Sequence, residues 1–352
     1  MVSASRINSV SIESEFDQIL IVGPSWVGDM VMAQSLYKTL CDQNPNCVID
    51  VLAPGWSLPV LSRMREVRNV IDQPTAHGEL AWGKRKTLGA QLATVGYSQA
   101  ILLPNSLKSA LIPAFAKIPV RTGWRGEYRY GLLNDIRLLN KSRYPLMVER
   151  FVALAYEVGA ALPAQLPRPE LSVDTHNQTK VLAEFSLSVQ QPILALCPGA
   201  EFGPSKQWPA RHFASVAKHY IAKGWQVWCF GSNNDVAISE QIKTLAGSES
   251  CHVVAGKTAL GDAIDLLGLA KAVVSNDSGL MHIAAALERP LVAVYGSTSA
   301  DFTPPLSDVV EMVDTDEPCS PCFKRECPLG HLNCLNKLEA SLVIDALKRL
   351  GV

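Results

Sequence analysis

A carboxylate follows a glycine-rich turn near the start of the chain. Asp29 ends the segment GPSWVGD (residues 23–29), which comes directly after an apolar run. Such a carboxylate can serve as a general base in a cleft, or it can be an ordinary acid in a first helical turn, where the helix dipole favours it. The segment matches neither G-x-G-x-x-G nor a P-loop, which disfavours a dinucleotide or NTP site. Both roles of Asp29 stay open on this evidence.

Two segments in the second half of the chain could bind phosphate groups. Lys206 lies in a loop rich in glycine and proline (residues 198–209), where its ammonium either binds phosphate as a point charge or is simply solvated. The segment SNDSGLMH (residues 275–282) combines an N-cap residue with free backbone N–H groups at a helix start, which suits a diphosphate. A single histidine one turn into a helix is more often structural. The candidates in this segment are Asp277, Ser278, Gly279, Leu280 and His282.

Basic and aromatic residues are interleaved late in the first half of the chain. Lys108, Arg121, Arg125 and Arg129 lie near Trp124, Tyr128 and Tyr130. In a chain of net charge near zero, such a local cluster could hold an anionic ligand, or it could be an ordinary solvated face. Arg121 is the better candidate because glycines follow it in R-T-G-W-R-G. For the small cluster of basic residues 84–86, a solvated face is the preferred interpretation.

Cysteines cluster near the end of the chain. The spacing Cys-x2-Cys-x4-Cys-x3-His-x2-Cys is compatible with a tetrahedral structural zinc site that uses four of its five members. An iron–sulfur cluster is less favoured, and the alternative is a set of reduced thiols in a surface loop. The total of nine cysteines is odd, which argues against a disulfide framework. The five candidate ligands are Cys319, Cys322, Cys327, His331 and Cys334.

Strand and helix patterns alternate along the chain and restart after an interruption. Short apolar runs at residues 17–23, 47–53 and 99–103 alternate with helical patterns, and the alternation resumes at residue 192. This is typical of βαβ units with mainly parallel sheets. The proline-rich and polar stretch 160–192 is expected to link two units. The sequence thus predicts two α/β domains, and the cleft between their strand ends is where the candidate residues would meet.

Four parts of the chain are expected. Residues 1–16 would be a disordered leader, and residues 17–175 the first α/β domain. Residues 176–335 would be the second α/β domain, which includes the cysteine-rich segment (residues 319–334). Residues 336–352 would form a terminal helix that folds back on the first domain.

Composition narrows the class of protein. The chain has 352 residues, 48% of them hydrophobic and 18% charged, which is enough to bury one or two sizeable cores and excludes a disordered chain. Its net charge of −1 disfavours a nucleic-acid partner. No apolar run approaches the length of a membrane span, and the N-terminus has no apolar h-region. A cytoplasmic protein is therefore expected.

Six segments together resemble one enzyme family, the ADP-heptose–lipopolysaccharide heptosyltransferases. The resemblance runs from Asp17 to the end of the chain, and it is specific because all six segments occur in the correct order. It is greatest to the members that add the second heptose of the inner core. The segments are GPSWVGDMVMAQSLYKTL, LPNSLKSAL, RTGWRGEYRYGLLND, PLMVERFVALAY, CPGAEFGPSKQWP and NDSGLMHIAAAL.

The resemblance implies a fold, a reaction and residue roles. The fold would be that of GT-B glycosyltransferases, two Rossmann-like domains facing across a cleft, with the acceptor on the first domain and the nucleotide sugar on the second. The reaction would be an inverting transfer of L-glycero-D-manno-heptose from ADP-heptose to the first heptose on Kdo-lipid A. Asp29 matches the family's general base, and Lys206 its lysine on the donor diphosphate. Asp277, Ser278, Gly279, Leu280 and His282 match its nucleotide-sugar motif.

The resemblance also implies a place in the cell. Because this acceptor lies at the cytoplasmic face of the inner membrane, peripheral contact with that membrane is expected. Arg121, Lys108 and Arg125 would contact the acceptor. No D-x-D pair stands where a metal-dependent glycosyltransferase would place one, so no essential cofactor is expected. One departure from the family is Glu201-Phe202, where relatives that add the first heptose carry hydroxyl residues.

Other functions compete with this one. A heptosyltransferase with a different core acceptor would carry the same motifs. A GT-B epimerase or phosphorylase would share the fold, as would a non-catalytic sugar-nucleotide-binding protein. Loss of transfer with retained donor binding after Asp29→Ala would separate an enzyme from a binding protein.

Overall fold

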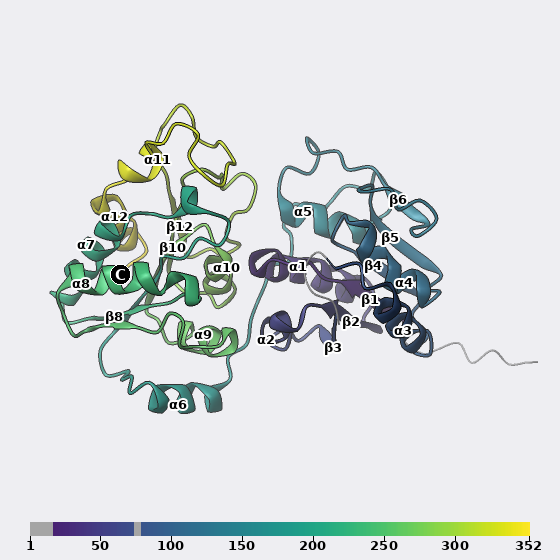
Figure 1. The fold of residues 1–352 in the computed structure, drawn as a ribbon, viewed down its shortest axis with the longest axis horizontal. Helices are drawn as coiled ribbons and strands as arrows, with labels where there is room; N and C mark the ends of the chain where they lie inside the picture. Colours follow the sequence, from purple (N-terminus) through teal and green to yellow (C-terminus); the bar gives the residue numbers. More distant parts are fainter. Residues whose placement is uncertain (1–16, 74–78) are drawn as a thin grey trace, which may run out of the picture.

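The computed structural model describes residues 17–73 and 79–352, which form two α/β domains side by side (Figure 1). Each domain is built on a six-stranded sheet in which all paired strands run parallel. This confirms the predicted fold class. The expected leader at residues 1–16 lies outside the described residues.

The first sheet begins with strands of apolar sequence. DQILIV in β1 and CVIDVLA in β2 become buried towards their carboxyl ends, as strands covered by helices on both faces do. The sheet consists of β1 (Asp17–Val22), β2 (Cys47–Ala53), β3 (Val67–Asp72), β4 (Gln99–Leu102), β5 (Val120–Trp124) and β6 (Asp135–Arg137). Its order is β3-β2-β1-β4-β5-β6, so the chain switches direction across the sheet between β1 and β4. In such sheets ligands bind beyond the carboxyl ends at this switch point.

The second sheet repeats this arrangement. It consists of β7 (Ile193–Cys197), β8 (Gln226–Cys229), β9 (Cys251–Val253), β10 (Ala272–Asn276), β11 (Leu291–Val294) and β12 (Val310–Val313). Its order, β12-β11-β10-β7-β8-β9, places the switch point between β7 and β10. The loops after these two strands carry Lys206 and Asp277, so the topology brings the two predicted donor segments together.

Helices cover both faces of each sheet. Those of the first domain are α1 (Val27–Gln43), α2 (Leu58–Leu61), α3 (Trp82–Leu92), α4 (Leu111–Phe115) and α5 (Met147–Val152). Those that follow are α6 (Thr175–Glu184), α7 (Ala210–Ile221), α8 (Val236–Ala246), α9 (Leu260–Leu267), α10 (Gly279–Ala286), α11 (Asn333–Asn336) and α12 (Ala340–Arg349). Within residues 17–73 and 79–352, no helix is both long and apolar enough to cross a membrane.

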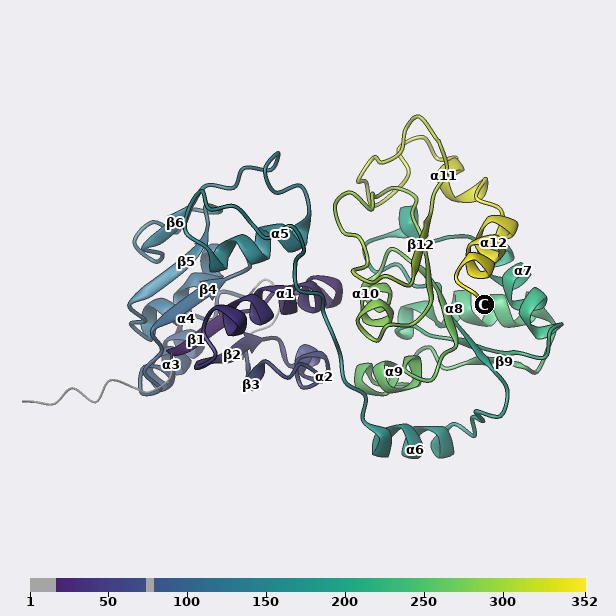
Figure 2. The same cartoon turned by 180° about the vertical axis from the view of Figure 1, so that it is seen from behind.

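Two expectations about the second half of the chain are wrong. The terminal helix does not fold back on the first domain: α12 packs on α7, β11 and β12 of the second (Figure 2). Its buried Val343, Ala346 and Leu347 complete the core on that side of the second sheet, and this contact decides its position. The stretch 160–192 is not purely a linker either, because it contains α6, which packs on α9.

Two helix N-termini meet where the domains touch. The beginnings of α1 and α10 lie against each other, and the apolar core is continuous through them. A Cβ atom at Gly28 would lie 2.6 Å from Cδ2 of His282, and one at Gly279 would lie 2.6 Å from Cβ of Val27. Both glycines are therefore required for this close approach, a role that the sequence alone did not reveal.

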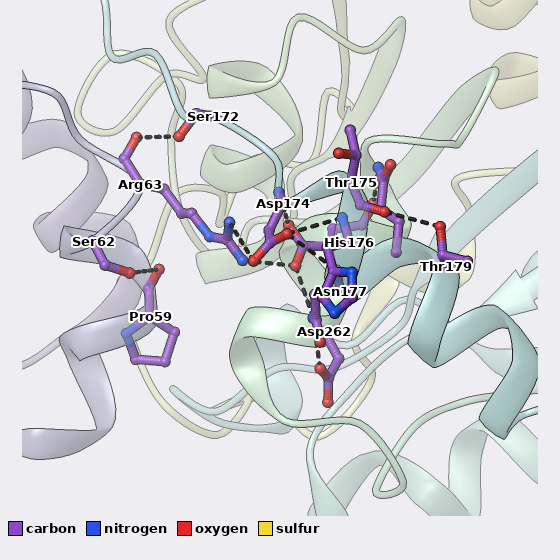
Figure 3. A network of polar contacts seen from close by, with 12 residues as sticks. Pro59, Ser62, Arg63, Ser172, Asp174, Thr175, His176, Asn177, Thr179 and Asp262 are labelled. Carbon is purple, nitrogen blue, oxygen red and sulfur yellow. Dashed lines mark hydrogen bonds and ion pairs between the residues drawn. The ribbon is translucent and has the colours of Figure 1, made fainter.

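A polar network ties the domains together away from this contact (Figure 3). Arg63, which follows α2, donates to the fully buried carboxylate of Asp265 in α9 at 2.7 Å. The same carboxylate accepts from the Asp174 backbone at 2.8 Å and from the Asn177 amide at 2.9 Å. A buried carboxylate needs such donors, so the network stabilises one relative orientation of the two domains.

Candidate active site

A cavity of about 900 Å³ opens between the domains at the carboxyl ends of both sheets. The first domain contributes the loop after β1, the start of α1, the turn after β2 and the start of α5. The second contributes the loops after β7, β8, β9, β10 and β11 and one residue of the cysteine-rich segment. The lining includes Trp26, Gly28, Asp29, Trp56, Met147, Phe202, Lys206, Ser232, Thr258, Asp277, Ser278, Gly279, Leu280, His282, Thr298, Phe302 and Phe323. Every residue predicted for catalysis and donor binding therefore faces one space.

Asp29 lies in the first turn of α1, and it lines this cavity. Burial raises the pKa of its carboxyl to about 6. The charge of Lys206 lowers this pKa, whereas the charge of Asp277 raises it. A carboxylate with a pKa near the working pH is suited to accept a proton in the reaction. The interpretation of Asp29 as a plain helix acid does not account for this environment.

Lys206 and Asp277 form a nearly buried ion pair on the opposite side. The Lys206 Nζ lies 2.6 Å from Oδ2 of Asp277, and the two side chains are only 14% and 5% exposed. The same Asp277 oxygen accepts a 2.6 Å hydrogen bond from the Thr298 hydroxyl. The ammonium is thus held at the cavity wall with a defined direction, where an anionic ligand can share it.

The N-terminus of α10 also faces the cavity, through Ser278, Gly279 and Leu280. Ser278 stands at the N-cap position. Contrary to expectation, its side chain makes no capping hydrogen bond within the described residues, because its hydroxyl pairs with that of Ser275 at 3.3 Å. First-turn N–H groups without a side-chain cap are available to an anion, and the helix dipole favours negative charge there.

His282 is buried in the same region. Burial lowers the pKa of its imidazole to about 4, so the ring is neutral at physiological pH. It packs on the backbone at Gly28 and thereby helps to join α10 to α1. This geometry favours the structural role of His282 over that of a proton donor.

The predicted acceptor residues lie elsewhere on the first domain. Arg121, Lys108 and Arg125 are outside the lining of the cavity in the part of the chain that the structure describes. The guanidinium of Arg121 donates to the Leu132 carbonyl at 2.6 Å. Arg129, expected on the same basic face, is only 2% exposed and donates to backbone carbonyls of its own domain, so it cannot contact a ligand or membrane.

Several lining residues were missed in the sequence, among them Thr298 and Phe302. Thr298 orients Asp277, and Phe302 closes the cavity beside Met147 of the first domain, whose N–H donates to the Phe302 carbonyl at 2.9 Å. Both follow β11, and a loop after a central parallel strand is itself a signal for a site. Nothing in their local sequence distinguishes them further.

The predicted zinc ligands do come together, around a small cavity of about 20 Å³ that Ser205 and Ser297 also line. Among the described residues, however, no group of three or more Cys, His, Asp or Glu side chains is arranged to hold a metal ion. The cysteines are free thiols. The structure therefore gives no support to a zinc site at Cys319, Cys322, Cys327, His331 and Cys334.

Comparison with known proteins agrees with this architecture. The model of glycosyltransferase family 9 (heptosyltransferase) matches residues 85–333. Lipopolysaccharide heptosyltransferase 2 of Escherichia coli is 52% identical over 341 residues, 95% of this chain and 98% of that protein. The Salmonella typhimurium protein of the same name is also 52% identical, over 84% of this chain and 87% of its own.

A solved structure agrees as well. That of E. coli ADP-heptose lps heptosyltransferase II superposes with a TM-score of 0.85 at 46% identity, and the match covers 95% of this chain and 98% of that one. The resemblance drawn from the six sequence segments is thus confirmed. Since the family model spans more than half of the chain and the relatives match nearly all of it, this protein belongs to glycosyltransferase family 9, the heptosyltransferases.

Proposed function

We propose that the protein transfers L-glycero-D-manno-heptose from ADP-heptose, with inversion, to the first heptose of the lipopolysaccharide inner core. The observation that carries the proposal is the carboxyl of Asp29, whose pKa is raised to about 6 where it faces Lys206 and Asp277 across the interdomain cavity. The names of the relatives that match almost the whole chain support the substrate class.

Asp29 would be the general base. An acceptor hydroxyl is a weak nucleophile until a nearby group takes its proton. In the proposed step, the acceptor oxygen bonds to the anomeric carbon of the donor from the face opposite ADP, and the hydroxyl proton passes to the Asp29 carboxylate. The bond between that carbon and the phosphate oxygen breaks, and its electron pair leaves with ADP.

Lys206 and the N-terminus of α10 would stabilise the leaving group. As the bond breaks, negative charge grows on the diphosphate, and fixed donors aimed at that charge lower the barrier. The ammonium of Lys206 and the first N–H groups of α10, at Gly279 and Leu280, line the same cavity. Asp277, held by Thr298, keeps the ammonium oriented before the donor arrives.

The first domain would bind the acceptor, which is Kdo-lipid A already bearing one heptose. Arg121, Lys108 and Arg125 are the proposed contacts with its acidic groups. Exposed aromatic side chains lie beside them: Tyr128 is 87% exposed and Tyr130 65%. A basic and aromatic surface is suited to anionic headgroups, which supports peripheral contact with the cytoplasmic face of the inner membrane.

Transfer from ADP-heptose to two purified acceptors tests the function. One acceptor bears Kdo alone, and the other already carries the first heptose. We expect product only on the heptosylated acceptor, with an inverted anomeric configuration. Product only on the Kdo acceptor would refute the acceptor assignment, and donor binding without transfer to either would favour a non-catalytic binding protein.

The surface contact is tested separately. Arg125→Ala should weaken sedimentation with vesicles that contain the heptosylated acceptor, and should make that binding less sensitive to salt. Lys86→Ala, which removes an exposed charge from the same domain, is the matched control. Unchanged binding of the Arg125 variant would show that this surface is merely solvated.

A further inference from the structure

The cysteine-rich segment (residues 319–334) lies against two loops of the proposed donor site. Its residues 320–325 contact the loop that carries Lys206 and the loop that carries Thr298. We propose that Arg325 is a positioning residue that keeps the Lys206 ammonium directed at the donor diphosphate. This inference rests on the proposed function, since it deepens the role given there to Lys206.

The first support is a set of direct bonds between the segment and the Lys206 loop. The Arg325 Nε donates to the Phe202 carbonyl at 2.7 Å. In return, the Ser205 N–H donates to the Arg325 carbonyl at 3.2 Å, and the Ser205 hydroxyl to the Lys324 carbonyl at 2.5 Å. A Cβ atom at Gly203 would collide with the Arg325 carbonyl oxygen, so only glycine permits this approach. The loop is thus fixed on both sides of Gly203.

The second support is the ring of Phe202, which connects the two cations. The Lys206 Nζ lies 5.1 Å from the ring centroid, and the Arg325 guanidinium carbon lies 5.9 Å from it. Both are cation–π distances. Arg325 binds the Phe202 carbonyl and also lies near the Phe202 ring. It therefore fixes the position of the ring relative to the Lys206 ammonium. This gives a reason for an aromatic residue at position 202, which departs from the hydroxyl residues of the first-heptose relatives.

The third support is the contact of the segment with the other donor loop. The Phe323 N–H donates to the Ser297 carbonyl at 2.7 Å, and the Ser320 hydroxyl to the Gly296 carbonyl at 2.6 Å. The hydroxyls of Ser205 and Ser297 are 2.9 Å apart. The segment therefore joins the loop of Lys206 to the loop of Thr298. The side chains of these two residues hold the carboxylate of Asp277.

The test is Arg325→Ala in the full-length enzyme. It should raise the Kd of ADP and the KM of ADP-heptose about fivefold to tenfold, as expected for the loss of one hydrogen bond and one cation–π contact. The KM of the acceptor and the melting temperature should not change. Arg325→Lys, which keeps a cation at the ring, should recover part of the loss.

Lys324→Ala is the matched control, because it removes one positive charge from the neighbouring position. The Lys324 side chain is exposed, and it makes no hydrogen bond or ion pair within residues 17–73 and 79–352. It should bind ADP as the wild type does. A double-mutant cycle isolates the mechanism: in a Lys206→Ala background, Arg325→Ala should add less than about a twofold effect, because both residues act on one contact.

Three results would overturn the positioning role alone: ADP affinity unchanged by Arg325→Ala, full additivity with Lys206→Ala, or equal losses for donor and acceptor together with a lower melting temperature. Each of these results would leave the proposed transfer activity of the wild type intact. A wild-type protein that neither binds ADP nor transfers heptose would overturn the proposed function, and the positioning role with it.

Discussion

Replacement of Asp29 by asparagine should abolish transfer and at the same time stabilise the folded protein at neutral pH. The protein around the carboxyl partly shields it from water, and this burial raises its pKa from 3.8 to about 6, although Lys206 opposes the change. Asparagine keeps the shape of the side chain but has no charge to desolvate. It also cannot accept the proton of an acceptor hydroxyl.

The size of the stabilisation follows from the pKa. A carboxyl whose pKa changes from 3.8 unfolded to about 6 folded destabilises the folded state by up to about 3 kcal/mol when it is ionised. Asp29 is partly exposed, and solvent screening reduces this figure, so a gain of about 1–3 kcal/mol is expected. Because the pKa of Asp29 is raised in the folded state, its ionised form destabilises the fold. The stability gained by Asp29→Asn is therefore full above pH 6 and disappears as the pH falls from 6 towards 3.8.

Urea unfolding of the wild type and Asp29→Asn at pH 7.5 and at pH 4 measures this. The variant should be more stable at the higher pH only, and it should still bind ADP. Transfer by the wild type should rise with pH about a midpoint near 6, to reach about ten times its pH 5 rate at pH 7.5. Asp42→Asn, at an exposed position of the same helix, is the matched control and should change neither property.

Two outcomes would refute this reasoning. Transfer that persists in Asp29→Asn would remove Asp29 as the base. An Asp29→Asn variant that is less stable than the wild type by the same amount at both pH values would show that the carboxylate is a structural hydrogen-bond acceptor, rather than a desolvated group.

Three further perturbations test the site and the domain contact. Lys206→Ala should lower kcat/KM about 10²–10³-fold in a steady-state transfer assay, since it removes a donor aimed at the developing charge; a loss below tenfold would contradict this. Gly28→Ala should destabilise the fold by about 1–3 kcal/mol in urea unfolding, because the new methyl meets a buried imidazole, whereas Gly83→Ala, with open space around it, should be neutral or stabilising. Arg63→Ala should lower the free energy of unfolding by about 3 kcal/mol, because it leaves the buried Asp265 carboxylate without its cation; an effect near zero would mean that the amide donors suffice.

Strands and helices with a strong local pattern could be predicted closely from the sequence. The strand expected at residues 47–53 has those bounds, because a continuous apolar run between turn residues has few other solutions. β3 was missed: its sequence VRNVID carries two charged residues, Arg68 and Asp72, and is only partly buried, so its pattern is weak. α6 was missed for a similar reason, since a single residue, Val181, is buried in it.

The sequence by itself determined the fold class, the family and three of the loops that line the candidate site, because apolar runs, turn residues and motif order are local properties. Only the tertiary structure decided the burial, charge and contacts of those residues. The raised pKa of Asp29 needs a cavity built from both domains, and the pairing of Lys206 with Asp277 joins residues 71 positions apart. The burial of Arg129 and the packing of α12 on the second domain depend likewise on surfaces that exist only after the chain has folded. Desolvation and long-range contacts of this kind depend on how close residues lie in space. The positions of these residues along the chain do not reveal that distance.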